Sequence, residues 1–143
     1  MVLKCISAAI IGLTALSSAT FAAPAEGTWL SQDGGTKVRL SNCGGKLCGT
    51  VVWLHEPTDH ATGRPKTDKL NPNPAKRTRP MIGLQVAHGL APDGPNKWSG
   101  LIYNADDGRT YQASFQVQSH STATVQGCVL SVLCKSKTWT RAN

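Results

Sequence analysis

The stretch YQASFQVQ, residues 111–118, alternates apolar and polar side chains along its whole length. In an extended chain the apolar residues of this stretch fall on one face and the polar residues on the other. A second stretch, KVRLSN at residues 37–42, shows the same alternation. Both stretches therefore predict β-strands with one face buried and one face in water.

Further short segments of strand type lie on either side of these two, separated by turn sequences such as DGG at 33–35 and CGG at 43–45. Glycine and aspartate in these turns suit the positive φ values of tight hairpins. No stretch has a sustained helical period. About eight short strands predict an all-β fold, a small closed antiparallel barrel, with a two-sheet β-sandwich as the alternative. The predicted strands are 27–31, 36–42, 47–54, 82–87, 97–103, 110–118, 122–129 and 137–141.

The two ends of this strand-rich region carry a matched pair of motifs. Gly27-Thr28-Trp29 opens the first strand and Trp139-Thr140-Arg141 closes the last. A guanidinium group stacks favourably over an indole face. We therefore expect Arg141 to lie over Trp29 and to close the barrel.

The N-terminal residues have the pattern of an export signal. Lys4 precedes a short apolar run at 6–16, and small residues at Ala22 and Ala23 offer a cleavage site. The run is too short to span a bilayer. We expect a signal peptide at 1–23, a single domain at 24–143 and a periplasmic or secreted protein that does not span the membrane.

Removal of the signal peptide would leave four cysteines, Cys43, Cys48, Cys128 and Cys134. An even number in an exported domain indicates disulfides, for which three pairings are formally possible. Each pair flanks a short segment, so we expect local bridges within each hairpin. Four buried thiols or a zinc site are the alternatives, although the two spacings fit zinc poorly.

One segment, residues 57–80, is rich in proline and carries most of the positive charge. It holds six basic and two acidic residues, a net charge of +4. Such a long connection can be functional, and its cations could contact an anionic envelope component. A solvated loop is the simpler alternative, and nucleic acid is not expected because no aromatic residue lies among the cations. The cations assigned to this surface are Arg64, Lys66, Lys76, Arg77 and Arg79.

Several motifs recur in a fixed order along most of the chain: GTWL at 27–30, CGGKLCGTVVWL at 43–54, DKLNP at 68–72, RPMIGL at 79–84, WSGLIYN at 98–104, DGRTY at 107–111 and TWTR at 138–141. Together they resemble the exported bacterial family known as domain of unknown function 2147. The resemblance implies a small lipocalin-like or streptavidin-like barrel in the cell envelope and implies no reaction. This chain has Tyr103-Asn104-Ala105 where members commonly have Tyr-x-Pro, and Cys128 with Cys134 is not expected in every member.

Candidate catalytic chemistry is sparse. His55 and His60 enclose Glu56 and Asp59, which are suitable ligand types for a divalent ion, but Pro57 disrupts any helix that would align them. We therefore predict no metal and keep His55 and His60 as weak candidates. A nucleophile elbow and a phosphate-binding glycine loop are absent from the sequence, so no cofactor is expected and an enzyme is unsupported.

The aromatic residues favour a binding site. A small barrel either fills its interior with side chains or holds one small ligand. We expect Trp53, Trp98 and Tyr103 to line a ligand mouth, against the alternative that the rings pack in a filled core. The leading hypothesis is an envelope protein that binds a small, partly apolar molecule. The alternatives are an interaction module acting through the basic segment and, third, a metal-dependent enzyme; the sequence does not give the oligomeric state.

Overall fold

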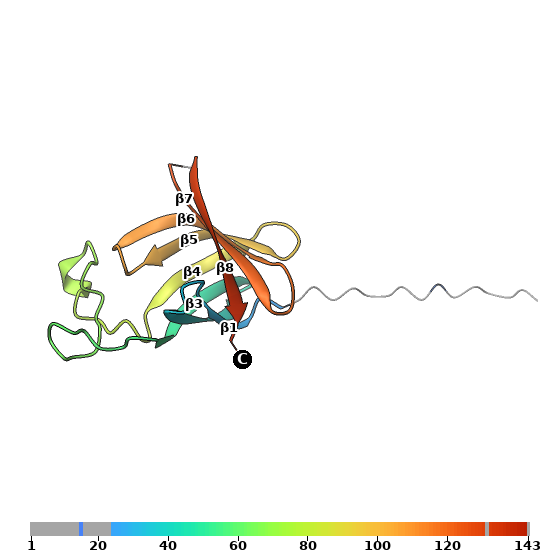
Figure 1. Cartoon of the computed structure of the whole chain (residues 1–143). Coiled ribbons are helices and arrows are strands. Elements are labelled where there is room, and N and C mark those ends of the chain that lie inside the picture. Colours follow the sequence, from blue (N-terminus) through green and yellow to red (C-terminus); the bar gives the residue numbers. More distant parts are fainter. Residues whose placement is uncertain (1–14, 16–23, 131, 143) are drawn as a thin grey trace, which may run out of the picture.

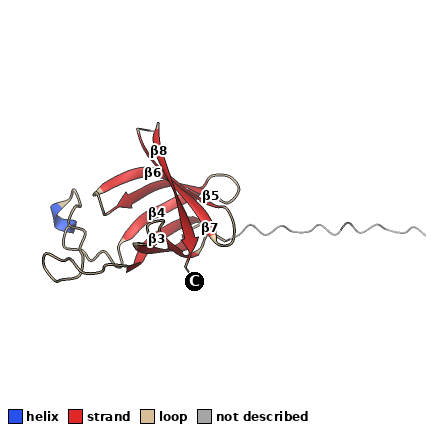
Figure 2. Cartoon of the chain, in the orientation of Figure 1, coloured by secondary structure: helices blue, strands red, loops and turns tan. Residues whose placement is uncertain are grey.

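The computed structural model describes residues 15, 24–130 and 132–142. Apart from residue 15, the predicted signal peptide lies outside the described residues. The fold is all-β: eight antiparallel strands form a closed barrel in sequence order, with one short 3-10 helix (Figures 1 and 2). No helix in this described part of the chain is long and apolar enough to cross a membrane. The elements are β1 (Gly27–Leu30), β2 (Thr36–Cys43), β3 (Lys46–Leu54), η1 (Pro74–Lys76), β4 (Gln85–Pro92), β5 (Lys97–Asn104), β6 (Arg109–Val117), β7 (Thr122–Val129) and β8 (Leu133–Arg141).

The predicted strand order is confirmed, but the bounds of β4 and β8 were wrong by more than one residue. β4 runs over Gln85–Pro92 instead of 82–87. β4 begins at Gln85, because residues 81–84 form a turn in which the Leu84 N–H donates to the Met81 carbonyl and Gly83 has a φ of +95°. β8 begins at Leu133, four residues before the predicted start, because it pairs with β7 up to the hairpin. The closed barrel also excludes the β-sandwich.

The barrel closes where β1 meets β8. The two strands pair over only two positions, Trp29 with Arg141 and Leu30 with Thr140. The Arg141 guanidinium lies 4.3 Å from the centroid of the Trp29 ring, as the terminal motifs predict. The same guanidinium donates hydrogen bonds of 2.6–2.8 Å to the carbonyls of Pro24, Glu26 and His120. One side chain therefore joins both ends of the domain.

Trp29 is the centre of the packing at this closure. Its ring is fully buried and meets Phe115 edge to face at 5.2 Å, while its Nε1 donates to the Ala25 carbonyl at 2.9 Å. The alternating residues of β2 and β3 supply much of the remaining core, including Val38, Leu40 and Val51. The interior is thus built from the apolar faces that the sequence alternation predicts.

Both predicted local disulfides are present. Cys43–Cys48 crosses the β2–β3 hairpin, and Cys128–Cys134 crosses the β7–β8 hairpin. Because each bridge joins neighbouring strands, its main effect is to hold one hairpin in register. Two disulfides are compatible with a periplasmic or extracellular location.

Candidate ligand-binding site

The barrel encloses an apolar cavity of about 40 Å³. All nine side chains that line it are aliphatic or aromatic, and they come from every strand except β1 and β3. A cavity with such a lining stays dry and accepts apolar groups. The lining residues are Val38, Leu40, Val86, Ala87, Leu90, Ile102, Phe115, Val125 and Trp139.

Trp139 is a cavity-lining residue of β8, one position before Thr140, which pairs with Leu30 of β1. It lies on β8 opposite the fully buried Ala123 of β7, yet its own side chain is only partly buried. β8 is held to β1 by only two residue pairs, at Leu30 and Trp29. Trp139 therefore lies in the part of the wall that the fewest backbone hydrogen bonds hold in place.

A long β3–β4 loop, residues 55–84, lies at the end of the barrel where β3 and β5 finish (Figure 1). A polar cluster joins this loop to the barrel. The buried carboxylate of Asp68 accepts hydrogen bonds from the Tyr103 hydroxyl at 2.5 Å, from Asn71 at 2.8 Å and from Arg79 at 2.9 Å. Since Tyr103 belongs to β5, this cluster fastens the loop to the barrel wall.

The charge states in this cluster follow from the same contacts. Burial acts to raise the pKa of Asp68, but the hydrogen bonds from Tyr103, Arg79 and Asn71 outweigh it and hold the pKa below its ordinary value. Burial and the neighbouring Asp68 carboxylate raise the pKa of Tyr103 to about 12. The cluster is therefore a carboxylate held by donors, with the Tyr103 phenol protonated at neutral pH.

The loop also fits closely against the β5–β6 turn. Gly108 has a φ of +71°, and a Cβ atom added at this position would overlap the carbonyl group of Leu70. Only glycine satisfies both the backbone conformation and the close approach. This contact and the Asp68 cluster hold the long loop in one position although it contains little regular structure.

The three aromatic residues assigned to a ligand mouth do not lie together at one opening. Trp53 is 36% exposed, and the ammonium of Lys37 lies 4.7 Å from its ring centroid. Trp98 and Tyr103 lie near opposite ends of β5, about 16 Å apart along an extended strand. None of the three lines the interior cavity. Tyr103 instead donates a hydrogen bond to Asp68.

The basic segment is largely engaged in contacts within the loop. Arg79 pairs with Asp68, Lys69 with Asp59 at 3.2 Å and Lys66 with Glu56 at 3.9 Å. The Arg77 Nε donates to the Asn71 carbonyl at 2.8 Å. Within the described part of the chain, Arg64 and Lys76 form no ion pair, so they are the cations of this segment most available to an external anion.

The histidines considered as weak metal candidates have other neighbours. His55 packs edge to face against Trp53 at 6.0 Å, and the His60 Nε2 lies 3.7 Å from a Glu56 carboxylate oxygen. Across the described residues, no three potential ligands are gathered as a metal site would require.

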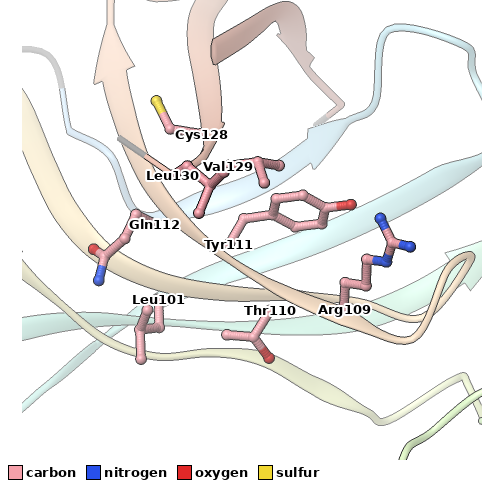
Figure 3. A pocket seen from close by; sticks show the side chains of 8 residues that line it. All are labelled: Leu101, Arg109, Thr110, Tyr111, Gln112, Cys128, Val129 and Leu130. Carbon is pink, nitrogen blue, oxygen red and sulfur yellow. The ribbon is translucent and has the colours of Figure 1, made fainter. Parts of the chain in front are cut away.

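A second hollow lies on the outside of the barrel. This open groove of about 460 Å³ runs between the start of β6 and the end of the β7–β8 hairpin (Figure 3). Tyr111 lies in it and donates a hydrogen bond to Asp107. The groove is open to solvent, and its lining mixes polar and apolar groups. The lining residues are Leu101, Arg109, Thr110, Tyr111, Gln112, Cys128, Val129 and Leu130.

The strand alternation predicts that Val38, Leu40 and Phe115, which line the cavity, face the interior. The sequence analysis did not select Trp139 or Ala87 as binding residues, although both line the cavity. The sequence does not determine the strand register, so it could not predict that Phe115 of β6 pairs with Val125 of β7.

The sequence matches the family described as "Uncharacterized protein conserved in bacteria (DUF2147)" over residues 27–141. The chain belongs to this family. The match begins with β1 and ends with β8, so it covers the whole barrel. No curated protein matches the chain.

The barrel of this DUF2147 member is similar to a solved structure, described as "Protein HP1028 from the human pathogen Helicobacter pylori belongs to the lipocalin family". The two sequences are 24% identical, the alignment covers 82% of each chain, and the TM-score is 0.71. At this identity the similarity shows the fold, which is lipocalin-like.

Proposed function

We propose that this protein is an exported binding protein that holds a small apolar ligand inside its barrel. The observation that carries the proposal is the interior cavity, whose nine lining side chains are all aliphatic or aromatic. The interior of an eight-stranded barrel is just wide enough to be filled by side chains or to hold one small ligand, and here part of it is left unfilled. The absence of charged groups from the cavity lining selects an apolar molecule over a polar one.

The size of the cavity determines how a ligand would enter. A volume of about 40 Å³ accepts only a few heavy atoms, whereas a cavity of about 150 Å³ holds benzene. A larger ligand therefore requires a side chain to move. Trp139 is the best candidate, because it is partly exposed and lies on the strand with the shortest pairing to β1. Rotation of its ring outward would open the cavity beside the β1–β8 closure.

Export is part of the same proposal. The pattern of residues 1–23 is that of a signal peptide, which would leave a single domain from residue 24. The two disulfides support this, because such bridges persist in oxidising compartments. A binding protein in the periplasm or outside the cell would meet small apolar molecules that cross the envelope.

The proposal is tested with N-phenyl-1-naphthylamine, an apolar dye whose fluorescence rises in non-polar surroundings. Ala87 is 2% exposed and lines the cavity, so Ala87→Val fills it, while Ala91→Val adds the same groups to an exposed position of the same strand. We expect Ala87→Val to weaken dye binding about tenfold or more, Trp139→Ala to strengthen it, and Ala91→Val to leave it unchanged. Equal binding by all four proteins would refute interior binding.

The basic segment supports a second candidate function more weakly. Arg64 and Lys76 are exposed and could contact an anionic envelope component. If they do, Arg64→Ser with Lys76→Ser should reduce retention on an anionic resin and its salt sensitivity more than Arg39→Ser, a change at an exposed cation on β2. Equal retention of both variants would remove this candidate.

A further inference from the structure

The hairpin between β7 and β8 presents the largest group of exposed aliphatic side chains among the described residues. We call it the β7–β8 tip. Such residues are rarely clustered on the surface of a protein that has no partner there. The tip consists of Val129, 43% exposed, Leu130, 82%, Val132, 79%, and Leu133, 68%.

The structure holds the tip away from the barrel core. The Cys128–Cys134 disulfide crosses the hairpin at the base of the tip, and Val129 pairs with Leu133 just beyond it. Figure 1 shows this end of the hairpin projecting past the neighbouring strands. The covalent bridge at the base fixes the register of the two strands that carry the tip.

Positive charge accompanies the tip. Lys135 lies on β8 two residues after Leu133, and Arg109 lines the groove beside Val129 and Leu130 (Figure 3). From residue 108 to the end of the chain the sequence contains no aspartate or glutamate. The last acidic residue in the sequence, Asp107, accepts hydrogen bonds from the backbone N–H of Arg109 and from the Tyr111 hydroxyl.

Another apolar side chain extends this surface. Leu101 of β5 is 54% exposed and lines the same groove as Val129 and Leu130. The apolar surface therefore continues from the tip onto the outer wall of the barrel, and Arg109 lines the same groove. An aliphatic patch with cations at its margin matches the boundary between lipid acyl chains and anionic headgroups.

We propose that the β7–β8 tip docks this protein onto a lipid bilayer that contains anionic phospholipid. The aliphatic side chains of Leu130 and Val132 enter the acyl boundary, and Lys135 and Arg109 contact the phosphates. Four aliphatic residues are too few to cross a bilayer, so the tip stays at the interface. A second copy of the chain fits less well, because a symmetric contact between tips would bring Lys135 and Arg109 toward cations of the same kind.

The tip fits a membrane better than the basic segment does. The β3–β4 loop and the tip project in different directions from the barrel (Figure 1). The loop cations Arg79, Lys69 and Lys66 are already paired with carboxylates. The tip combines unpaired apolar surface with positive charge, whereas the loop offers mainly charge.

The test is co-sedimentation with vesicles made of phosphatidylcholine alone or mixed equally with phosphatidylglycerol. We expect the protein to bind the mixed vesicles, and Leu130→Ser with Val132→Ser to weaken binding about tenfold or more. Ile82→Ser is the control, since Ile82 is 47% exposed but lies in the β3–β4 loop. Lys135→Ser should reduce the salt sensitivity of binding, and Lys76→Ser should not.

Two results would overturn the proposal. One is equal binding by the tip variant and the Ile82→Ser control. The other is a concentration-dependent dimer in sedimentation velocity that the tip substitutions abolish while vesicle binding stays absent. The dye assay reports on the cavity separately, because Leu130→Ser with Val132→Ser leaves all nine cavity-lining residues intact. A negative vesicle result therefore does not contradict ligand binding in the barrel, and a negative dye result does not contradict membrane docking.

Discussion

The Tyr103 hydroxyl donates a 2.5 Å hydrogen bond to the buried carboxylate of Asp68, and this contact joins the β3–β4 loop to β5. The two residues are 35 positions apart in the sequence. Arg79 and Asn71, which also donate to Asp68, both belong to the loop. Tyr103 is therefore the member of the cluster that belongs to the barrel.

Replacement of Tyr103 by phenylalanine should lower the free energy of unfolding by about 1–3 kcal/mol, because it leaves a buried carboxylate short of one donor. The measurement is urea denaturation at neutral pH. Tyr111→Phe is the matched control, since Tyr111 also donates to an aspartate, Asp107, but at an exposed site. Equal effects of the two substitutions would contradict a special role for the Asp68 cluster.

The stability should also fall at alkaline pH. In the folded protein the pKa of Tyr103 is raised to about 12, so folding favours the protonated phenol. This contribution is complete below the unfolded pKa of about 10 and is lost as the pH rises through the folded value. Urea midpoints measured from neutral pH to about pH 11 should fall more steeply for the wild type than for Tyr103→Phe. Parallel curves would show that Tyr103 does not titrate in this way.

Gly108→Ala should separate the β3–β4 loop from the β5–β6 turn, because the added methyl group would overlap the Leu70 carbonyl. We expect a loss of about 2 kcal/mol or more in unfolding free energy. Gly63→Ala is the control: its φ is +67°, but nothing lies within 4 Å of an added Cβ. The difference in unfolding free energy between the two variants measures the effect of the close contact. Equal unfolding free energies would mean that the loop moves aside without destabilising the protein.

Arg141→Ala should destabilise the barrel by about 2 kcal/mol or more, because it removes the stack on Trp29 and three hydrogen bonds to backbone carbonyls. Arg39→Ala, on the exposed face of β2, should change stability by less than about 0.5 kcal/mol. Thermal and urea unfolding measure both. A neutral Arg141→Ala would show that the two β1–β8 pairs close the barrel unaided.

Much of the fold could be predicted from the sequence because the signals were local. The alternation in residues 111–118 and the glycine-containing turns predicted the strands. The motifs that contain Trp29 and Arg141 predicted where the barrel closes. The start of β8 was harder to predict. Residues 135–137 of β8 do not pair with β1 and are exposed, so the sequence there shows no alternation of buried and exposed side chains.

The candidate site was less predictable because it depends on register and on distant contacts. Trp139 reaches the cavity only through the pairing of β8 with β7, and sequence spacing does not reveal which rings face inward. Tyr103 was assigned to a ligand mouth, but its partner Asp68 lies in a loop without periodicity. A buried carboxylate in such a loop has no sequence signal that separates it from an exposed one.

Ligand binding inside the barrel is tested most directly by methyl NMR of the protein titrated with N-phenyl-1-naphthylamine. We expect shifts in the methyl groups of Val38, Leu90 and Ile102, which line the cavity, and loss of these shifts in Ala87→Val. Shifts confined to Leu130 and Val132 of the β7–β8 tip, or no shifts at all, would contradict it.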